Sequence, residues 1–349
     1  MVRTPNNNRP NGPGPLTFWT IGTIIVAVAS TIVVLMKYHF TAFCLSLALS
    51  ACGGGGGGST TSAPPVDTAT HYSISSYDNA KKLDHYATVW PDGLGSPATV
   101  QFKYKDGTPG LIVAGSVNNA DINALPGTLN MYKLVAGAWT QQNLIDSGAV
   151  NNCIHPRKTL ATDLNQDGQV DFIILCHGVD VAPFPGERSR VLLSQSNGHY
   201  VQDYMSTDVG FWHGGSTIDL NGDGYPDLLA TLGHDVQAFI NDKTGKFVAS
   251  AEYSFTTGNG TYSIEIVDVN GDGKADFLYG GHEWDGATTV VLNPGNNKFA
   301  TGSKIVIPAV AGMGVVLDFV YTPSNNSIYL MRTGGDATFA NFYQGVFVQ

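Results

Sequence analysis

Three segments of the chain repeat one spacing of acidic and amide residues. They read DLNQDGQVD from Asp163, DLNGDGYPD from Asp219 and DVNGDGKAD from Asp268. Their first residues are 56 and 49 positions apart, and each segment runs directly into a short apolar stretch. A repeat of about fifty residues is typical of propellers and solenoids, in which each repeat is one supersecondary unit. This spacing constrains the chain to an array of similar units.

The rest of each repeat indicates strands. After the apolar stretch come VLLSQSNGHYV (191–201), FINDKTGKFV (239–248) and VVLNPGNNKFA (290–300), each an apolar run, a polar turn and an aromatic start of another run. The chain has 42 glycines and only 13% charged residues, which suits tight turns between strands. We therefore expect an all-β fold, a β-propeller of four-stranded blades.

The acidic segments have the donors of a calcium loop. They are not EF-hands, because loop position 12 is Ile174, Ala230 or Tyr279, where an EF-hand has a bidentate Glu. Oxygen side chains at positions 1, 3, 5 and 9, with the carbonyl of position 7, suit a hard cation. We expect about three structural Ca²⁺ ions. The expected ligands are Asp163, Asn165, Asp167, Gln169, Asp171, Asp219, Asn221, Asp223, Tyr225, Asp227, Asp268, Asn270, Asp272, Lys274 and Asp276.

On these segments the chain resembles the FG-GAP/VCBS repeat family, whose β-propeller blades also occur in integrin α-subunit heads. The resemblance covers roughly residues 97–349 and implies five repeats here. The first (102–115) keeps only Asp106 and Gly107 of the loop, and the last (317–331) keeps only Asp318, so neither is expected to bind calcium this way. Residues 71–80 are expected to supply the missing strand of the last blade. The family more often has seven blades, so the blade number stays open.

Histidines gather at the other end of the predicted hairpins. His177, His234 and His282 follow the last Asp of a loop by six, seven and six residues, and His155 and His213 come near the start of a first strand. Five of the nine histidines are therefore expected on the face opposite the loops. The candidate ligand face comprises His155, Arg157, Lys158, His177, Asp180, Trp212, His213, His234, His282, Glu283, Trp284 and Asp285.

Three roles are open for this face. The histidines can be structural, since they can satisfy backbone carbonyls at strand ends. The face can bind a protein or a glycan, with Trp212 and Trp284 as stacking surfaces. It can also hold a metal-assisted or acid–base centre, in which neutral imidazoles with Glu283 or Asp285 bind a transition metal. The long segment 177–190 is expected to lie over this face as a stiff, proline-containing loop.

Charge and missing motifs exclude several classes of function. A net charge of −10 without a basic run in the body of the chain argues against nucleic acid as a partner. The chain contains no G-x-S-x-G, H-E-x-x-H or P-loop motif. We therefore expect a binding or adhesion module. The alternative is a carbohydrate-active enzyme, because some polysaccharide lyases resemble this chain in having propellers with similar calcium loops. A spacer without a small ligand is a third possibility.

The first seventy residues indicate export. Residues 16–36 are uncharged and long enough to cross a bilayer, while residues 36–52 have the layout of a signal peptide. Leu49 to Cys52 resembles a lipobox, which makes Cys52 the lipidation site. Segment 1–35 is then a transmembrane anchor or lies upstream of the true start at Met36. We favour the second, because a complete lipoprotein signal begins there.

Residues 53–69 read as a flexible Gly/Ser/Pro-rich linker, and residues 70–349 as the propeller. We expect a lipid-anchored protein of the cell envelope, attached to the outer membrane in a Gram-negative host because Gly53 is not Asp. Outside the signal, Cys153 and Cys176 remain. In an oxidising compartment they form a disulfide, or they stay as two buried free thiols in neighbouring strands.

Overall fold

The computed structural model describes residues 95–117, 121–146, 148, 150–322, 327–338 and 346–348. This part of the chain is almost entirely β: it has twenty strands and one 3₁₀ turn, η1 (Phe299–Thr301). The signal, the lipidation site, the linker and the strand expected at 71–80 lie outside the described residues. Within the described ranges, no helix has the length and apolar character needed to span a bilayer.

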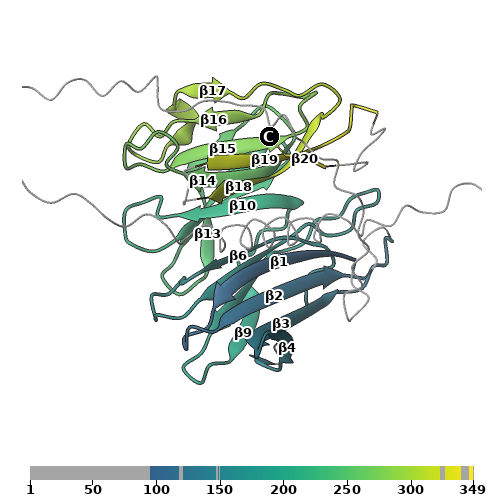
Figure 1. Ribbon diagram of the computed structural model, residues 1–349, viewed down its shortest axis with the longest axis vertical. Helices are drawn as coiled ribbons and strands as arrows, with labels where there is room; N and C mark the ends of the chain where they lie inside the picture. Colours follow the sequence, from purple (N-terminus) through teal and green to yellow (C-terminus); the bar gives the residue numbers. More distant parts are fainter. Residues whose placement is uncertain are drawn as a thin grey trace, which may run out of the picture.

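Four sheets form the blades of a propeller, as expected (Figure 1). The first blade consists of β1 (Gly95–Lys103), β2 (Pro109–Ser116), β3 (Thr128–Val135) and β4 (Ala138–Gln142). The second consists of β6 (Pro156–Thr162), β7 (Asp171–Cys176), β8 (Arg190–Ser194) and β9 (Tyr200–Tyr204), with the short β5 (Ile145–Asp146) parallel to β9.

The third blade consists of β10 (Trp212–Ile218), β11 (Asp227–Leu232), β12 (Asp235–Asn241) and β13 (Phe247–Thr256). The fourth consists of β14 (Thr261–Val267), β15 (Asp276–Gly281), β16 (Thr289–Val291) and β17 (Lys304–Val306). A last sheet has three described strands, β18 (Val315–Thr322), β19 (Ser327–Thr333) and β20 (Val346–Val348). All five hairpins expected from the repeats are therefore present.

The first strands of successive sheets lie side by side at the centre. β1 contacts β6, β6 contacts β10, β10 contacts β14, and β14 contacts β18. Figure 1 shows β6 and β10 between the first blade at the bottom and the fourth blade at the top. The ends of these five central strands therefore come together on two faces of the molecule.

The hydrophobic core lies between the blades. Every residue of β7 is buried, because this second strand is covered on both sides by neighbouring blades. Between the second and third blades, Leu175 of one packs with Trp212 and Leu228 of the other. The outermost strand of the first blade, β4, is exposed. Burial thus falls from the centre outwards, which explains why the apolar runs after the acidic segments are continuous.

Two local expectations are wrong. Phe299 does not start the last strand of the fourth blade. It lies buried in η1, and β17 begins only at Lys304. Asp318 does not open a loop either, because it lies inside β18, whose turn follows Thr322. Its carboxylate instead faces the middle of the molecule, where it accepts a hydrogen bond from Ser263 Oγ at 2.8 Å.

Candidate functional site

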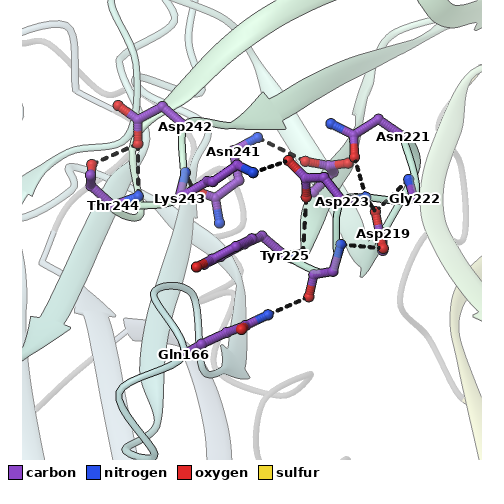
Figure 2. Close-up of polar contacts among 12 residues, drawn as sticks. Gln166, Asp219, Asn221, Gly222, Asp223, Tyr225, Asn241, Asp242, Lys243 and Thr244 are labelled. Atoms are coloured by element: carbon purple, nitrogen blue, oxygen red, sulfur yellow. Dashed lines mark hydrogen bonds and ion pairs between the residues drawn. The ribbon is translucent and has the colours of Figure 1, made fainter.

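The three acidic segments form closely similar loops between the first and second strands of their blades. In the second loop, Asp219 accepts hydrogen bonds from the backbone N–H groups of Gly222, Asp223 and Gly224 at 2.8–3.1 Å (Figure 2). Asn221 Oδ1 accepts from Asp223 N at 2.9 Å. Gly224 has φ +91°, a conformation that a glycine adopts without strain and that closes the turn.

The first and third loops repeat this pattern. Asp163 accepts from the N–H groups of Asp167 and Gly168, and Asp268 accepts from those of Gly271, Asp272 and Gly273. The bonds hold the side-chain oxygens of positions 1, 3 and 5 against the backbone N–H groups of each loop. This all-oxygen donor set fits a calcium ion.

Lysines lie beside two of the three loops. Lys243 Nζ is 3.4 Å from Asp223 Oδ2 in the second loop, and Lys274 Nζ is 3.4 Å from Asp272 Oδ2 in the third (Figure 2 shows the second). In the first loop the position-5 carboxylate, Asp167, accepts instead from Ser194 Oγ at 3.3 Å. The first loop is therefore the one whose position-5 carboxylate has no ion pair among the described residues.

The last Asp of each loop has a role that the sequence did not predict. Asp227 is fully buried, and its two oxygens accept from Leu220 N at 2.9 Å and from Asn241 N, at the end of β12, at 2.8 Å. Asp171 and Asp276 make the equivalent bonds. Burial raises the pKa of all three carboxyls, and the hydrogen bonds partly offset that effect. Each Asp therefore ties its loop to the third strand of the blade.

Amide side chains link the first and second loops to the next blade. Asn241 Nδ2 donates to Leu164 O at 2.8 Å, and Asn297 Nδ2 donates to Leu220 O at 3.3 Å. Gln166 in the first loop also donates to Gly224 O in the second at 2.6 Å, as Figure 2 shows. Since the acceptors are backbone groups of the loops, the loop conformation is coupled to the packing of the blades.

At the opposite end, a β-bulge or irregularity interrupts the start of all five central strands, and three of them carry residues of this face. In β6 the extra residue is Arg157, in β10 the bulge comprises His213 and Gly214, and in β14 it is Tyr262. A bulge redirects side chains locally and is frequent beside functional sites. Gly214 is needed here because a Cβ would collide with the backbone carbonyl of Tyr262 in the next blade.

These bulges help to build a row of rings across three blades. The row runs through His155, His177, His213, Tyr262, His282 and Trp284, and we call these six residues the ring row. Successive ring centroids are 4.2–4.9 Å apart. Most neighbours meet edge to face, while His282 and Trp284 stack at an interplanar angle of 19°. The sequence missed Tyr262, although it occupies the strand-start position of His213 one repeat later.

A disulfide and backbone hydrogen bonds fix the end of the ring row that lies in the second blade. Cys153 and Cys176 form a disulfide with Cα atoms 5.5 Å apart. His177 N donates to His155 O at 2.8 Å. Glu187 Oε1 accepts from the N–H of Ile154 at 2.7 Å. Two of the rings are therefore carried on a cross-linked hairpin end.

The histidines here are neutral. Burial is the main cause that lowers the pKa of His155, His177 and His213, and the positive charge of Arg157 lowers each further. His177 Nε2 lies 3.2 Å from His213 Nε2, so one of the two rings can donate to the other. The neutral rings supply lone pairs and weak donors rather than positive charge.

Two charged residues accompany the rings. Asp180 is half-buried, and its pKa is raised by burial and lowered by Arg157. Arg157 lies over the Tyr262 ring at 5.9 Å. Its guanidinium makes no hydrogen bond or ion pair within the described ranges. The second-blade end of the site therefore combines one cation, one carboxylate and several neutral rings.

Other predicted face residues lie elsewhere. Trp212 is 2% exposed and packs on Phe239 in the core, so it has no surface for a ligand. The Glu283 carboxylate is engaged by Arg332 and by Thr288 Oγ1. Lys158 points into the middle of the molecule, where its Nζ donates to Ile264 O at 3.2 Å.

His234 and Asp285 lie at the edge of the ring row. His234 is exposed, and no ring contact ties it to the ring row within the described residues. Asp285 Oδ2 is 3.6 Å from His282 Nδ1. The structure thus brings His155, His177, His213 and His282 together and leaves the fifth predicted histidine at the margin.

The segment 177–190 folds against the ring row. Val179 N donates to Pro185 O, and Glu187 pairs with Gly210 of the next blade. Phe184, which is 54% exposed, meets Phe211 edge to face, and the ring of Phe211 contacts His177. The segment therefore adds an exposed aromatic side chain beside the buried end of the row.

Known proteins resemble this chain in fold. A family model described as FG-GAP-like repeat matches residues 163–230 and 219–279. No curated protein matches the chain. Among solved structures, an Agrocybe aegerita lectin recognising non-reducing terminal N-acetylglucosamine is 18% identical, with a TM-score of 0.42 over 73% of this chain and 64% of the lectin.

Two further structures are similar at this level. A protein of unknown function from Dyadobacter fermentans DSM 18053 is 14% identical, with a TM-score of 0.47 over 73% of this chain and 75% of that one. An exo-β-1,3-galactanase from Phanerochaete chrysosporium is 9% identical, with a TM-score of 0.44 over 72% of this chain and 59% of that one. Together with the sheet arrangement, the family match shows that residues 163–279 consist of FG-GAP-like repeats within the blades of a β-propeller.

Proposed function

We propose that this protein is an exported binding module that docks a glycan on the face of the ring row, with calcium in the three acidic loops as its scaffold. The observation that carries the proposal is the half-buried part of the ring row, which comprises His213, Tyr262, His282 and Trp284 at 4.2–4.5 Å spacing; His155 and His177 are buried behind it. Aromatic rings with polar atoms at their edges suit the mixed apolar and hydroxylated faces of sugars. Phe184 and Trp284 offer the stacking surfaces.

The acidic loops supply the supporting half of the proposal. The oxygens at positions 1, 3 and 5 repel one another without a cation, so calcium would stabilise the folded state by mass action. The hydrogen bonds from Asn241 and Asn297 join the first and second loops to the next blade, so calcium that orders these loops would also stabilise the contacts between blades. The loops and the ring row lie at opposite ends of the same hairpins, which gives the metal a structural role.

A glycan-binding screen tests the docking surface. The full chain, purified in detergent with saturating Ca²⁺, is applied to a panel of neutral, uronic and sulfated oligosaccharides. Trp284→Ala should weaken binding roughly fivefold to tenfold, the loss expected for one stacked ring. Trp139→Ala is the matched control, because Trp139 is 42% exposed on β4, far along the chain from the row.

The outcomes are distinct. Equal affinity of Trp284→Ala and wild type for a bound sugar would place the ligand elsewhere and overturn the docking surface. Failure of every sugar, together with capture of a protein that Trp284→Ala no longer retains, would replace the glycan by a protein ligand. Thermal unfolding of each variant in Ca²⁺ separates a lost contact from a lost fold.

A carbohydrate-active enzyme remains the second candidate. What favours it is Arg157, whose guanidinium has no ion pair in the described part of the chain and lies among neutral imidazoles beside Asp180. A cation near neutral acid–base groups can stabilise a substrate carboxylate while a proton moves. Release of new reducing ends or unsaturated sugars from uronic oligosaccharides, abolished by Arg157→Gln, would establish turnover; intact oligosaccharides would support binding alone.

Attachment to the cell envelope belongs to the same proposal. Lipidation of Cys52 would tether the propeller to a membrane through residues 53–69. Expression of the wild type and of Cys52→Ser in a bacterial host, followed by separation of membranes, tests it. The wild type should sediment with the membranes, and Cys52→Ser should lose the lipid. Equal membrane retention of both would favour the transmembrane interpretation of residues 16–36.

A further inference from the structure

We propose that His155, His177 and Asp180 bind one divalent transition-metal ion at the end of the second blade, remote from the acidic loops. One ligand atom from each of the three residues lies within 4.8 Å of the others. His155 precedes β6, His177 follows β7, and Asp180 comes three residues later. Backbone geometry therefore brings the three donors together.

The spacing is close to what coordination requires. Ligand atoms bound to zinc at about 2.0–2.1 Å in a tetrahedral site lie roughly 3.3 Å from one another. Donors up to 4.8 Å apart must close in by up to about 1.5 Å to reach that spacing when the ion binds. Three protein ligands leave a fourth position for water or for an atom of a bound ligand.

The donor chemistry selects the class of metal. Two imidazoles and one carboxylate suit zinc, copper, nickel, cobalt or iron better than calcium or magnesium, which prefer oxygen alone. The imidazoles need no deprotonation, because burial already holds their pKa values below the ordinary range. The negative charge of Asp180 offsets part of the charge of the ion.

His177 is poised as a ligand. Its Nε2 lies 3.2 Å from His213 Nε2, and its Nδ1 is buried without a hydrogen-bond partner among the described residues. If Nε2–H donates to His213, Nδ1 keeps its lone pair. Metal-bound histidines generally have such a partner on the other ring nitrogen, which orients the ring and selects the tautomer. We assign His213 this orienting role.

The supporting structure is rigid. The Cys153–Cys176 disulfide closes the hairpin end two residues before His155 and one residue before His177. The backbone bond from His177 N to His155 O holds the two residues in register. Side chains carried by a cross-linked hairpin stay close to one geometry, and a metal site needs this.

Arg157 opposes the ion and gives a specific prediction. Its positive charge lowers the pKa of His155, His177 and Asp180, and the same charge repels a bound cation. A unit positive charge about 4 Å from a divalent ion weakens binding by roughly 2 kcal/mol through water-like screening, which is about thirtyfold. Arg157→Gln should therefore bind the metal more tightly than wild type, whereas a purely structural cluster would not respond.

Cobalt titration of the full chain tests the site. The protein carries no polyhistidine tag, and saturating Ca²⁺ occupies the acidic loops. Visible absorption of Co²⁺ bound to nitrogen donors in a four- or five-coordinate site is much stronger than that of hexaaqua Co²⁺, so it reports this site selectively. The expected result is one Co²⁺ per chain, displaced by Zn²⁺.

Variants locate the ion. His177→Ala and Asp180→Asn should each lose more than about a hundredfold in Co²⁺ affinity, and His213→Ala should lose about 10–100-fold, as for an outer partner. The exposed His234→Ala is the control and should bind as wild type does. Absence of strong visible bands with wild type, or unchanged binding by folded His177→Ala, would overturn the proposal. Thermal unfolding in Ca²⁺ without cobalt verifies that each variant is folded.

Discussion

Replacing Asp227 by Ala should destabilise the protein whether or not calcium is present. The carboxylate is fully buried and accepts hydrogen bonds from Leu220 N and Asn241 N. Its loss leaves two buried N–H groups without an acceptor, each costing about 1–3 kcal/mol. Burial of the Asp227 carboxylate is itself unfavourable, which is why its pKa is raised. Removing this buried charge therefore offsets part of the loss. The expected net loss is about 3 kcal/mol, or roughly 6–12 °C in Tm for a domain of this size.

The assay compares two loop positions. Urea unfolding is followed by tryptophan fluorescence in EDTA and in saturating Ca²⁺. Asp227→Ala should lose similar stability in both, whereas Asp223→Ala should lose most of its stability only in Ca²⁺, since position 5 is an expected ligand whose Oδ2 is held only by the ion pair with Lys243. Asp235→Ala is the exposed control and should stay within about 0.5 kcal/mol.

Two results would refute this reasoning. A loss for Asp227→Ala that appears only in Ca²⁺ would make the residue chiefly a metal ligand. A change below about 1 kcal/mol in both conditions would mean that the two N–H groups find other acceptors. If Asp227→Ala does not fold, Asp227→Asn keeps one acceptor and should show a smaller loss of the same kind.

Three further predictions follow from named contacts. Lys243→Met should raise the calcium affinity of the second loop about twofold to fivefold, because an ion pair with Asp223 competes with the metal; calorimetry would contradict this by showing weaker or equal binding. Lys158→Met should cost roughly 2–3 kcal/mol, because it leaves the Glu265 and Asp318 carboxylates unpaired. Burial is the largest single effect on the Lys158 pKa and lowers it, but the combined effects of Asp318 and Glu265 outweigh burial, so the pKa is raised in the fold. This contribution should therefore be present below about pH 10.5 and be lost as pH rises through the folded value. Urea unfolding between pH 7 and 11 would refute it by showing equal stability of wild type and variant. Cys153→Ser should cost about 3 kcal/mol for a 23-residue separation, and unchanged stability under non-reducing conditions would contradict it.

The sequence predicted the fold well because the repeat places the same residue types at the same turns. Each acidic segment is a loop between a first and a second strand, and each following apolar run is a buried strand. The period also placed His155, His177, His213 and His282 at one end of the hairpins, and the structure brings these rings together. Such inferences need only strand direction and residue order.

The remaining features depend on packing between blades. Trp212 reads as a surface ring beside His213, but strand alternation turns it into the core against Phe239. Lys158 lies one residue from Arg157, yet the bulge sends it towards the centre. Such outcomes require knowledge of which face of each strand the neighbouring blade covers.

The sequence also did not predict that the Asp at position 9 of each loop is buried and binds backbone N–H groups. In a D-x-N-x-D-G-x-x-D segment, the sequence does not distinguish the four oxygen side chains as ligands. The structure shows that the last one is buried and bound to the third strand of the blade. The signal that accompanies it is the Asn at the end of that strand in the third blade and just after it in the fourth, Asn241 and Asn293, whose N–H groups the carboxylates bind.

The calcium content of the full chain tests the central claim most directly. Equilibrium dialysis of the purified protein against buffered Ca²⁺ should give three ions per chain. Asp163→Asn, Asp219→Asn and Asp268→Asn should each remove one ion, because each replaces the carboxylate that organises its loop. No bound calcium, or an unchanged count in all three variants, would contradict a calcium-braced propeller.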